Sequence, residues 1–453
     1  MRTIAFHNLG CKVNSYEMEV MQQKFEKSGY IVVPFDTKAD IYLVNTCTVT
    51  NIADRKSRQM LHRAKKMNKD AIVVATGCYV QTDTEGAKAD ESIDICVGNN
   101  RKADIVNIVE EYIKNRENSV DIIDINSDAT YEDMTLEHTA EHARAYIKIQ
   151  DGCNQFCTYC AIPYARGRVR SRSKEKILEE ISNLVKEGYK EFVFTGIHIS
   201  SYGLDFVDKN SGDYLDSKQD IRTFTYKKGF LLDLIKSTTE IEGVERLRLG
   251  SLEPRIVTEE FVREISTLPT VCPHFHLSMQ SGCDETLKRM NRHYTSDEYY
   301  EKVSLLRKYY DNPAITTDVI TGFPGEDEEE FGKTEEFVKK VEFFETHIFK
   351  YSPRKGTVAA GMPNQNTDAV KSERSDRLEA INKLAGKKYR ESFIGKEVSV
   401  LIEEEKEING MRYLVGHTPN YIVCALDIES GHENEIITGV AEKLLTDEIL
   451  YIS

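Results

Sequence analysis

Apolar positions in the first 115 residues alternate between short strand-like runs and helix-like stretches. Four apolar runs indicate strands, at 3–6, 40–44, 71–75 and 93–97. Helical spacing follows the first, second and fourth runs; Met18, Met21 and Phe25, for example, share one helix face. This alternation predicts a doubly wound, parallel sheet.

The middle of the chain repeats the same alternation. Six further strands are predicted at 145–150, 191–197, 246–250, 274–279, 315–321 and 346–350. Helices fit between them, such as 174–186 with Ile177, Ile181 and Leu184 on one face. Six such units cannot close an eight-unit barrel, so a partial (β/α)6 barrel is expected.

Two polar segments interrupt this pattern. The acid-rich segment 117–143 is predicted to be a linker, and the turn-rich segment 205–229 a surface insertion.

The chain changes character after a further helix, from about Gly395. A helix is expected at 376–393, followed by five short strands at 398–402, 412–415, 421–426, 435–440 and 448–452. Such a series predicts a small β-barrel. Barrels of this size often bind unpaired RNA, although a structural cap is the alternative. The chain is therefore an α/β multidomain protein, with domains expected at 1–116, 140–370 and 380–453.

Composition limits the class of protein. With 40% apolar and 30% charged residues, the chain resembles ordinary globular proteins. No apolar run approaches the roughly 18 residues that a membrane span needs, and the first residues lack the apolar core of a signal peptide. Ten cysteines without an export signal indicate metal or redox ligands in a reducing, cytoplasmic compartment.

The net charge of −15 argues against indiscriminate nucleic-acid binding, but the charge is uneven. Residues 55–69 hold seven basic side chains and no acid, and residues 166–176 hold six basic side chains and one acid. Each run suits either a selective RNA contact or a solvated helix face.

Three cysteines carry the strongest chemical signal. Cys153, Cys157 and Cys160 stand in a C-x3-C-x2-C frame, which places three thiolates on one loop. A [4Fe–4S] cluster has four irons with cysteine as the usual ligand, so three cysteines leave one iron open for a small molecule. A zinc site normally wants a fourth ligand, and a disulfide is not expected in the cytoplasm.

A second set of three cysteines follows the predicted N-terminal strands. Cys11, Cys47 and Cys78 each come directly after one strand. Because parallel strands place their ligand sites at their carboxyl ends, these thiols are expected to converge. They too suit a [4Fe–4S] cluster with one free iron, the alternative being buried, unreactive cysteines.

The frame at 153–160, with Tyr159 before its last cysteine, resembles the radical S-adenosylmethionine (SAM) enzymes. The whole layout resembles one family of these, the methylthiotransferases, with an N-terminal cluster domain and a C-terminal TRAM domain. The stretches that carry this resemblance are Leu9-Gly-Cys-Lys-Val-Asn14, Asn45-Thr-Cys-Thr-Val49, Thr76-Gly-Cys-Tyr79, Gln150-Asp-Gly-Cys153, Gly196-Ile-His-Ile-Ser-Ser-Tyr-Gly203, Ser251-Leu-Glu-Pro254, Gln280-Ser-Gly282, Gly322-Phe-Pro-Gly-Glu326 and Gly416-His-Thr-Pro-Asn-Tyr421.

Within that family, Lys12-Val-Asn14 and Lys56-Ser-Arg-Gln59 resemble the branch that modifies N6-threonylcarbamoyladenosine (t6A) at position 37 of tRNA. The product would be 2-methylthio-t6A. Two alternatives are methylthiolation of isopentenyladenosine-37 or of a ribosomal-protein aspartate. A third, from a different class, is an RNA-binding protein with structural or redox-sensing clusters.

The resemblance implies roles for particular residues and partners. The six cysteines would be the cluster ligands at the catalytic centre, with SAM as the further cofactor. Its contacts would come from strand-end groups: Gly196, Ser251, Glu253, Gln280 and Asp318. Arg166, Arg168, Arg170 and Arg172 alternate, and would face RNA phosphates from one side of an extended stretch. The partners would be the anticodon arm of tRNA and an electron donor such as flavodoxin or ferredoxin, with no membrane.

Overall fold

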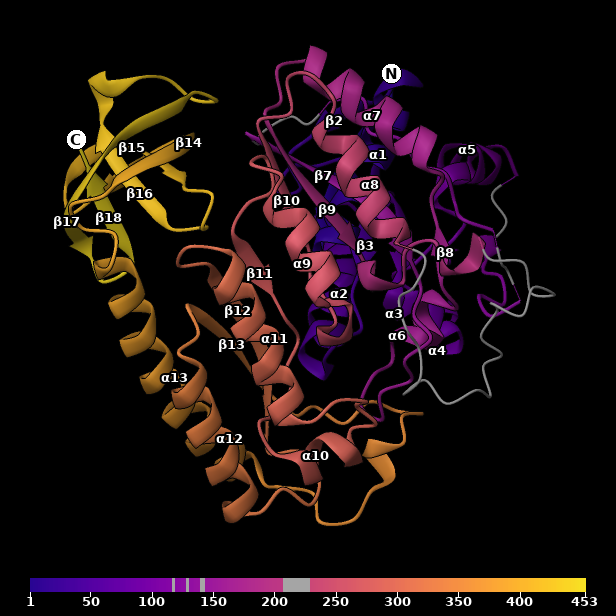
Figure 1. The fold of residues 1–453 in the computed structure, drawn as a ribbon. Coiled ribbons are helices and arrows are strands. Elements are labelled where there is room, and N and C mark those ends of the chain that lie inside the picture. The colour runs from indigo at the N-terminus through magenta and orange to yellow at the C-terminus, as the bar shows by residue number, and fades with distance from the viewer. Residues whose placement is uncertain (116–118, 128–129, 139–142, 207–228) are drawn as a thin grey trace.

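The computed structural model describes residues 1–115, 119–127, 130–138, 143–206 and 229–453. Most of the insertion predicted at 205–229, and parts of the linker predicted at 117–143, lie outside the described residues. The N-terminal third (indigo to purple) lies against the middle of the chain, and the C-terminal strands (yellow) stand at the end of one long helix (Figure 1).

The N-terminal part is a six-stranded parallel sheet in the order β2-β1-β3-β4-β5-β6. Its strands are β1 (Thr3–Asn8), β2 (Ile31–Val33), β3 (Ile41–Thr46), β4 (Ile72–Gly77), β5 (Ile95–Val97) and β6 (Ser119–Asp121). Its helices are α1 (Lys12–Lys27), α2 (Asn51–Met67), α3 (Cys78–Thr82), α4 (Thr84–Lys88) and α5 (Ile105–Asn115). The predicted parallel sheet is confirmed.

Both faces of this sheet are covered. Every residue of β3 is buried, which is typical of parallel strands between two layers of helices. Ile41 and Leu43 belong to one apolar cluster, and Tyr42 and Val44 to another on the opposite face. The three-residue edge strands β2 and β6 were not predicted, because such short runs carry no clear period.

The middle part contains seven strands: β7 (Arg144–Asp151), β8 (Arg170–Ser171), β9 (Glu191–Gly196), β10 (Arg246–Leu249), β11 (His274–His276), β12 (Ala314–Thr321) and β13 (Glu345–Lys350). Strands β7, β9 and β10 are parallel neighbours, as are β11, β12 and β13. Bridges at Leu247/Val271 and Leu252/Leu277 join the two groups. Six parallel strands thus form an open barrel, which confirms the predicted partial (β/α)6 fold.

Helices cover the outside of this barrel (Figure 1). They are α7 (Lys174–Lys186), α8 (Phe230–Thr239), α9 (Glu259–Ser266), α11 (Ser296–Tyr309) and α12 (Glu328–Val341). The short α6 (Ile162–Arg166) lies beside α3 instead, and α10 (Asp284–Arg289) precedes α11 at one end of the molecule. Strand residues alternate accordingly. Ala145, Ile147 and Ile149 of β7 pack in the main apolar cluster with the helices, whereas Tyr146 and Lys148 lie on the inner face.

The C-terminal part begins with α13 (Asp368–Glu391) and ends in a closed barrel of order β14-β15-β16-β18-β17. The strands are β14 (Glu397–Ile408), β15 (Met411–His417), β16 (Val423–Asp427), β17 (Ile436–Thr446) and β18 (Ile449–Ile452). Val400, Leu414 and Leu450 are among the residues that fill its core. The predicted small β-barrel is confirmed.

The turn between β15 and β16 fastens this small barrel to the large one. Tyr421 adopts a left-handed φ of 67°, and its ring stacks on His274 at 4.9 Å between centroids. The guanidinium groups of Arg144 and Arg248 lie 5.1 and 4.7 Å from the same ring. These ring contacts offset the energetic cost of the left-handed backbone conformation at Tyr421.

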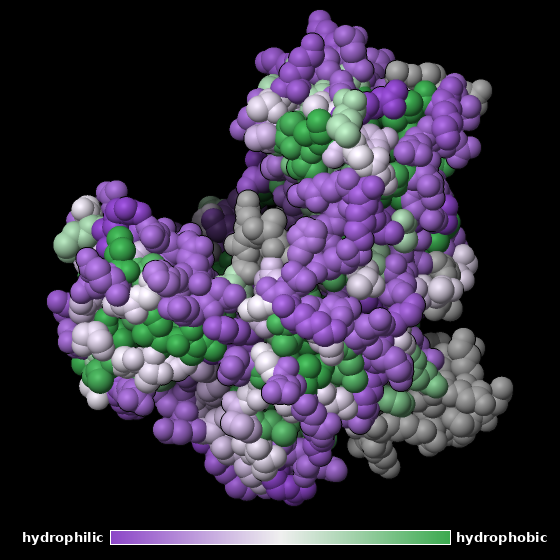
Figure 2. All heavy atoms as spheres, turned by 90° about the horizontal axis from the view of Figure 1, so that it is seen from above, coloured by the Kyte–Doolittle hydropathy of each residue, from purple (hydrophilic) through white to green (hydrophobic). Residues whose placement is uncertain are grey.

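The surface is largely hydrophilic in Figure 2, with apolar patches scattered among charged side chains. Within the described residues, no helix has both the length and the apolar character needed to cross a membrane.

Candidate functional site

The three N-terminal cysteines lie at the carboxyl ends of neighbouring strands. Cys11 caps α1 after β1, Cys47 follows β3, and Cys78 begins α3 after β4. A Cβ atom added to Gly10 would lie 3.2 Å from Cys47 Sγ, so the first two loops touch. Burial, and then the nearby Cys78 and Cys11, raise the pKa of Cys47 to about 11. The structure thus brings all three together.

Polar side chains fix these loops. The Asn14 amide donates to the carbonyls of Leu9 (2.7 Å) and Thr46 (3.1 Å), and so joins the first two loops. Asn99 donates to Cys78 Sγ (3.6 Å) and to the carbonyl of Ala165 in α6 (2.8 Å). α6 directly follows the second cysteine loop, so one amide connects the two sites.

The second set of cysteines lies on the loop after β7. Gly152 has a φ of +72°, and a Cβ there would lie 1.8 Å from the carbonyl oxygen of Arg168. Burial raises the pKa of Cys153 to about 12, with Cys157 as the next cause. The loop is held from outside, because Thr158 donates from its amide to Met290 O and from its hydroxyl to Arg289 O.

Both sets have the donor chemistry that an iron–sulfur cluster needs. All ten cysteines of the chain are free thiols. Backbone N–H groups face the sulfurs. Those of Thr48 and Val49 lower the pKa of Cys47, and that of Ile162 lowers the pKa of Cys160. In both cases burial has the larger, opposite effect on the pKa. N–H donors stabilise thiolates, which are the form that binds iron. The residues present therefore fit a cluster at each site.

Arg292 was not singled out in the sequence. Its Nη1 donates to Cys157 Sγ at 3.4 Å, and its Nη2 donates to the carbonyl of Ser278 at 3.1 Å. Hydrogen bonds to cluster sulfurs are one of the means by which proteins set reduction potentials. No local pattern identifies this residue, because its partner lies 135 positions away.

Four of the five predicted SAM contacts follow barrel strands. Gly196 ends β9, Ser251 and Glu253 follow β10, and Gln280 follows β11. Asp318, the fifth, lies within β12, where its carboxylate is 3.2 Å from His276 Nε2. All five are thus on strands or strand ends of one barrel, and their contact with SAM stays a prediction.

Several of these residues also have structural contacts. A Cβ on Gly196 would come within 2.9 Å of the carbonyl oxygen of Gln150, so the neighbouring strand alone requires glycine there. Glu253 is 4% exposed and pairs with Arg255 at 2.7 Å. Asp318 also groups with His276 and His347, whose ligand atoms lie within 4.8 Å of one another and could hold a divalent ion.

The prediction that four arginines contact RNA phosphates is wrong for three of them. Arg166, Arg170 and Arg172 are each 1% exposed and cannot reach RNA phosphates. They are buried because acidic groups neutralise them: Arg166 pairs with Glu17, which is distant in the sequence, and Arg172 pairs with Glu180 of the following helix, α7. Arg168 is exposed, with its guanidinium 4.4 Å from the Phe156 ring, and remains a predicted RNA contact.

Glu17 of α1 joins the N-terminal part to the barrel. It is 1% exposed and pairs with Lys102, Lys148 and Arg166. Burial would raise the pKa of Glu17, but Arg166, Lys102 and Lys148 together hold it well below its usual range. On another side, Arg354 donates to Thr48 Oγ1 at 2.7 Å, directly after Cys47. These contacts hold the first cysteine set against the barrel that carries the second.

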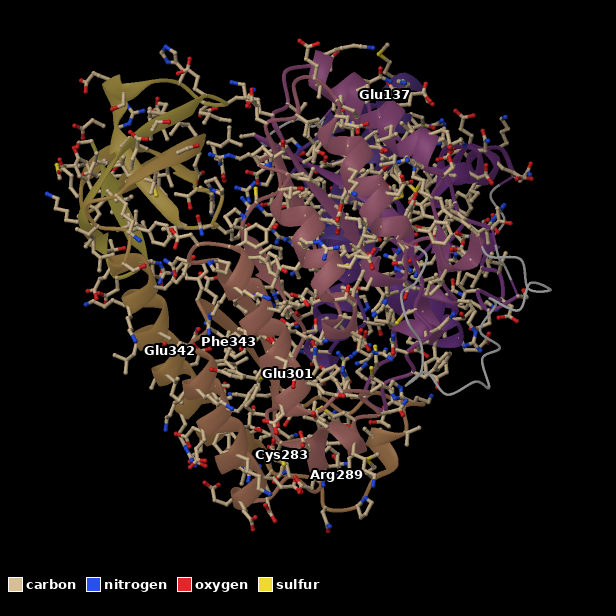
Figure 3. The ribbon with its side chains drawn as sticks, in the orientation of Figure 1. Glu137, Cys283, Arg289, Glu301, Glu342 and Phe343 are labelled. Atoms are coloured by element: carbon tan, nitrogen blue, oxygen red, sulfur yellow. The ribbon has the colours of Figure 1, made fainter. Side chains whose placement is uncertain are left out.

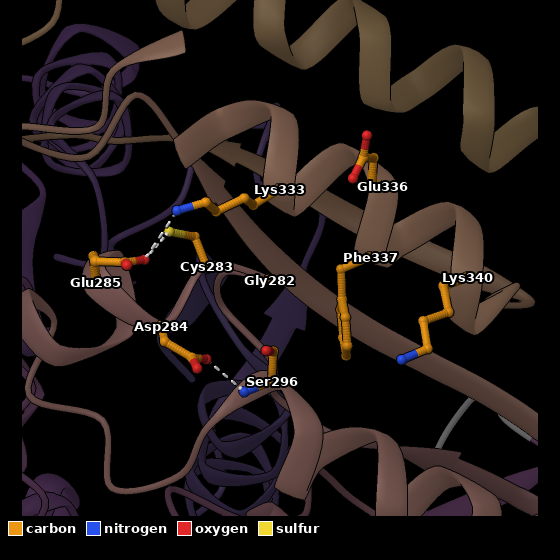
Figure 4. Close-up of a pocket in the computed structure, with 9 residues that line it drawn as sticks. All are labelled: Gly282, Cys283, Asp284, Glu285, Ser296, Lys333, Glu336, Phe337 and Lys340. Atoms are coloured by element: carbon orange, nitrogen blue, oxygen red, sulfur yellow. Dashed lines mark hydrogen bonds and ion pairs between the residues drawn. The ribbon is translucent and has the colours of Figure 1, made fainter. Parts of the chain in front are cut away.

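A hollow of about 360 Å³ lies away from both cysteine sets. It is lined by residues of α10, α11 and α12, and there Cys283 donates to Glu285 at 2.9 Å (Figure 4). Figure 3 places Cys283 and Arg289 at the end of the molecule opposite the C-terminal barrel. No cluster cysteine lines this hollow, so it is not the site described above.

Family comparisons match two parts of the chain. Residues 147–338 match the radical SAM superfamily, and residues 3–98 match the "Uncharacterized protein family UPF0004". The first match implies a [4Fe–4S] cluster and SAM as cofactors, as predicted.

Curated relatives cover nearly the whole chain. The threonylcarbamoyladenosine tRNA methylthiotransferase MtaB of Bacillus subtilis is 39% identical over 93% of this chain and 90% of its own length. That of Aquifex aeolicus is 37% identical over 91% and 95%. A tRNA-2-methylthio-N(6)-dimethylallyladenosine synthase of Clostridium botulinum is 35% identical over 90% and 87%.

Among solved structures, the radical SAM methyltransferase TsrM of Kitasatospora setae has a similar fold. Its TM-score is 0.56 at 13% identity, over 79% of this chain and 74% of that one. This likeness concerns the fold alone.

Proposed function

The chain belongs to the radical SAM methylthiotransferases that modify tRNA, and on that premise we propose that it methylthiolates C2 of t6A at position 37, giving 2-methylthio-t6A. The observation that carries this proposal is the pair of three-cysteine sets, each at strand ends and linked through Asn99. The first relatives named above act, by their names, on threonylcarbamoyladenosine in tRNA. This similarity supports t6A as the substrate.

The reaction replaces an aromatic C–H bond, which no side-chain base can usefully deprotonate near neutral pH. Bound cofactors would supply the chemistry: the two clusters and SAM would provide the radical reactivity, the sulfur and the methyl group that the side chains lack. The protein's task is to bind these groups, place the base between them and exclude water.

Particular residues would carry out this task. Cys153, Cys157 and Cys160 would hold the cluster that binds SAM, and Cys11, Cys47 and Cys78 the second cluster. Because each set has three thiols, one iron stays open in each. Gly196, Ser251, Glu253, Gln280 and Asp318 would contact SAM from the strand ends of the barrel.

The partners follow from the substrate. The anticodon arm would present its loop base to the barrel, with the C-terminal β-barrel and the exposed Arg168 adding RNA contacts. An electron donor such as flavodoxin or ferredoxin would reduce the cluster. With tRNA as its substrate, the enzyme would act in the cytoplasm.

Nucleoside mass spectrometry of tRNA from a deletion strain tests this function. The expected result is loss of 2-methylthio-t6A, with t6A itself accumulating and 2-methylthio-isopentenyladenosine unchanged. Restoration by the wild-type chain but not by Cys47→Ala would tie the loss to the proposed site. Unchanged 2-methylthio-t6A, or loss of the isopentenyl product instead, would overturn the proposal.

A further inference from the structure

Lys12 is a basic residue beside the first cysteine set, and its amine takes part in no ion pair within the described residues. It directly follows Cys11 and is the first residue of α1. Its side chain is exposed, and its amine lies 5.7 Å from the centre of the Tyr146 ring on the inner face of β7. Within the described part of the chain, no hydrogen bond or ion pair engages this amine.

Other cations near this junction are neutralised. Lys102, Lys148 and Arg166 share Glu17. Arg144 pairs with Glu403 and donates to the Tyr421 hydroxyl at 2.9 Å. Lys12 differs from all of them, because its charge is left available.

The charges around Lys12 leave a positive excess. Burial, and then Arg144 and Arg248, lower the pKa of Lys12 from its usual value, and Glu191 is the acidic neighbour that opposes this. Glu191 is itself shared by Arg144, Arg246 and Arg248, at 3.5, 3.6 and 3.1 Å. One carboxylate therefore faces several cations, and an anion from outside the chain would be stabilised here.

A second polar group at this junction lacks a partner. His274 is 8% exposed, and its Nδ1 atom has no hydrogen-bond partner in the described residues. Its pKa is well below the usual value, chiefly because of burial and then because of Arg248, with Lys12 a smaller contribution. A neutral imidazole beside Lys12 offers a hydrogen-bonding site without cancelling the positive charge.

We propose that Lys12 binds the carboxylate of the threonylcarbamoyl group, and so selects this anionic nucleoside over neutral N6-substituted adenosines. The proposal rests on the function proposed above. The modified base must place C2 at the cluster bound by Cys11, and its N6 substituent extends from the same ring. The residue next to Cys11 is therefore placed to recognise that substituent, and an unpaired ammonium suits its one negative charge.

Binding of two anticodon stem-loop RNAs to the full-length, anaerobically reconstituted enzyme tests Lys12. One RNA carries t6A at position 37, and the other carries the methyl ester of t6A, which lacks the negative charge. Lys12→Gln is expected to weaken binding of the t6A RNA by about 10- to 100-fold, because a charge-assisted hydrogen bond is lost. Binding of the ester RNA should change by less than about twofold, and Lys12→Arg should restore most of the affinity for t6A RNA.

Controls separate this effect from folding and from general RNA attraction. Iron content of Lys12→Gln should equal that of the wild type, which excludes loss of the neighbouring cluster. Lys66→Gln removes an exposed cation of α2 and should affect both RNAs equally. If Lys12→Gln binds t6A RNA as the wild type does, or weakens both RNAs alike, the assignment of Lys12 is wrong.

Turnover by the wild type distinguishes the two proposals. If the wild-type enzyme converts t6A RNA to its methylthio product while Lys12→Gln keeps the same KM, only the role of Lys12 fails. If the wild type converts isopentenyladenosine RNA but not t6A RNA, the proposed function fails, and the role of Lys12 with it.

Discussion

Glu17→Gln removes the carboxylate that lies between three buried cations. Removing one partner of a buried ion pair costs about 3–5 kcal/mol, because the remaining charge stays desolvated. Asp151 still faces Lys148 at 2.7 Å and Arg166 at 3.2 Å after this change. Asp151 neutralises part of the excess positive charge. The free energy of unfolding is therefore expected to fall by about 3 kcal/mol at pH 7, at the lower end of that range.

The loss should depend on pH in a defined direction. Glu17 has a folded pKa well below its usual value, so its charge stabilises the fold above the unfolded pKa, about 4.3. That stabilisation disappears as the pH falls through the folded pKa. The difference between wild type and Glu17→Gln should therefore be full at pH 7 and shrink below about pH 4.

Urea unfolding of the full-length protein, followed by circular dichroism, measures this difference. Glu179→Gln is the matched control, since Glu179 is exposed on α7, and should change stability by less than about 0.5 kcal/mol. Equal unfolding midpoints for the two variants at pH 7 would refute the role of Glu17. A difference that stays constant as the pH falls from 7 to about 2 would refute its electrostatic cause.

Four further substitutions probe the cysteine loop, two of the arginines and the docked C-terminal barrel. Gly152→Ala should abolish the cluster at Cys153–Cys160, because its Cβ would collide with Arg168 O; iron analysis would then find about half of the wild-type content. Arg172→Ala should destabilise the fold by about 3–5 kcal/mol by leaving Glu180 buried and unpaired, as urea titration would show. Arg168→Ala should instead lower the salt dependence of tRNA binding and leave the unfolding midpoint unchanged. Tyr421→Ala should free the C-terminal barrel, seen as faster hydrogen exchange in β11 and β16 with β3 of the N-terminal sheet unaffected.

The strands and both cysteine sets were predictable because their signals are local. Each long strand is a run of apolar residues, and each N-terminal cysteine follows such a run. The two edge strands escaped prediction because three residues, as in Ile31–Val33, are too few to show alternation.

The buried arginines show where local signals end. Arg166, Arg170 and Arg172 resemble an exposed basic stretch in the sequence, and the acids that bury them come from elsewhere in the chain. Glu17 lies 149 positions before Arg166. The reverse holds for Lys12, whose lack of a partner becomes visible only when α1 meets β7 and β9.

Cluster content tests the central claim most directly. Iron and sulfide analysis with Mössbauer spectroscopy would be applied to the anaerobically reconstituted wild type and to two triple variants. One replaces Cys11, Cys47 and Cys78 with alanine, and the other replaces Cys153, Cys157 and Cys160. Two [4Fe–4S] clusters are expected in the wild type, and one in each variant. Full iron content in either triple variant, or a single cluster in the wild type, would contradict two separate three-cysteine sites.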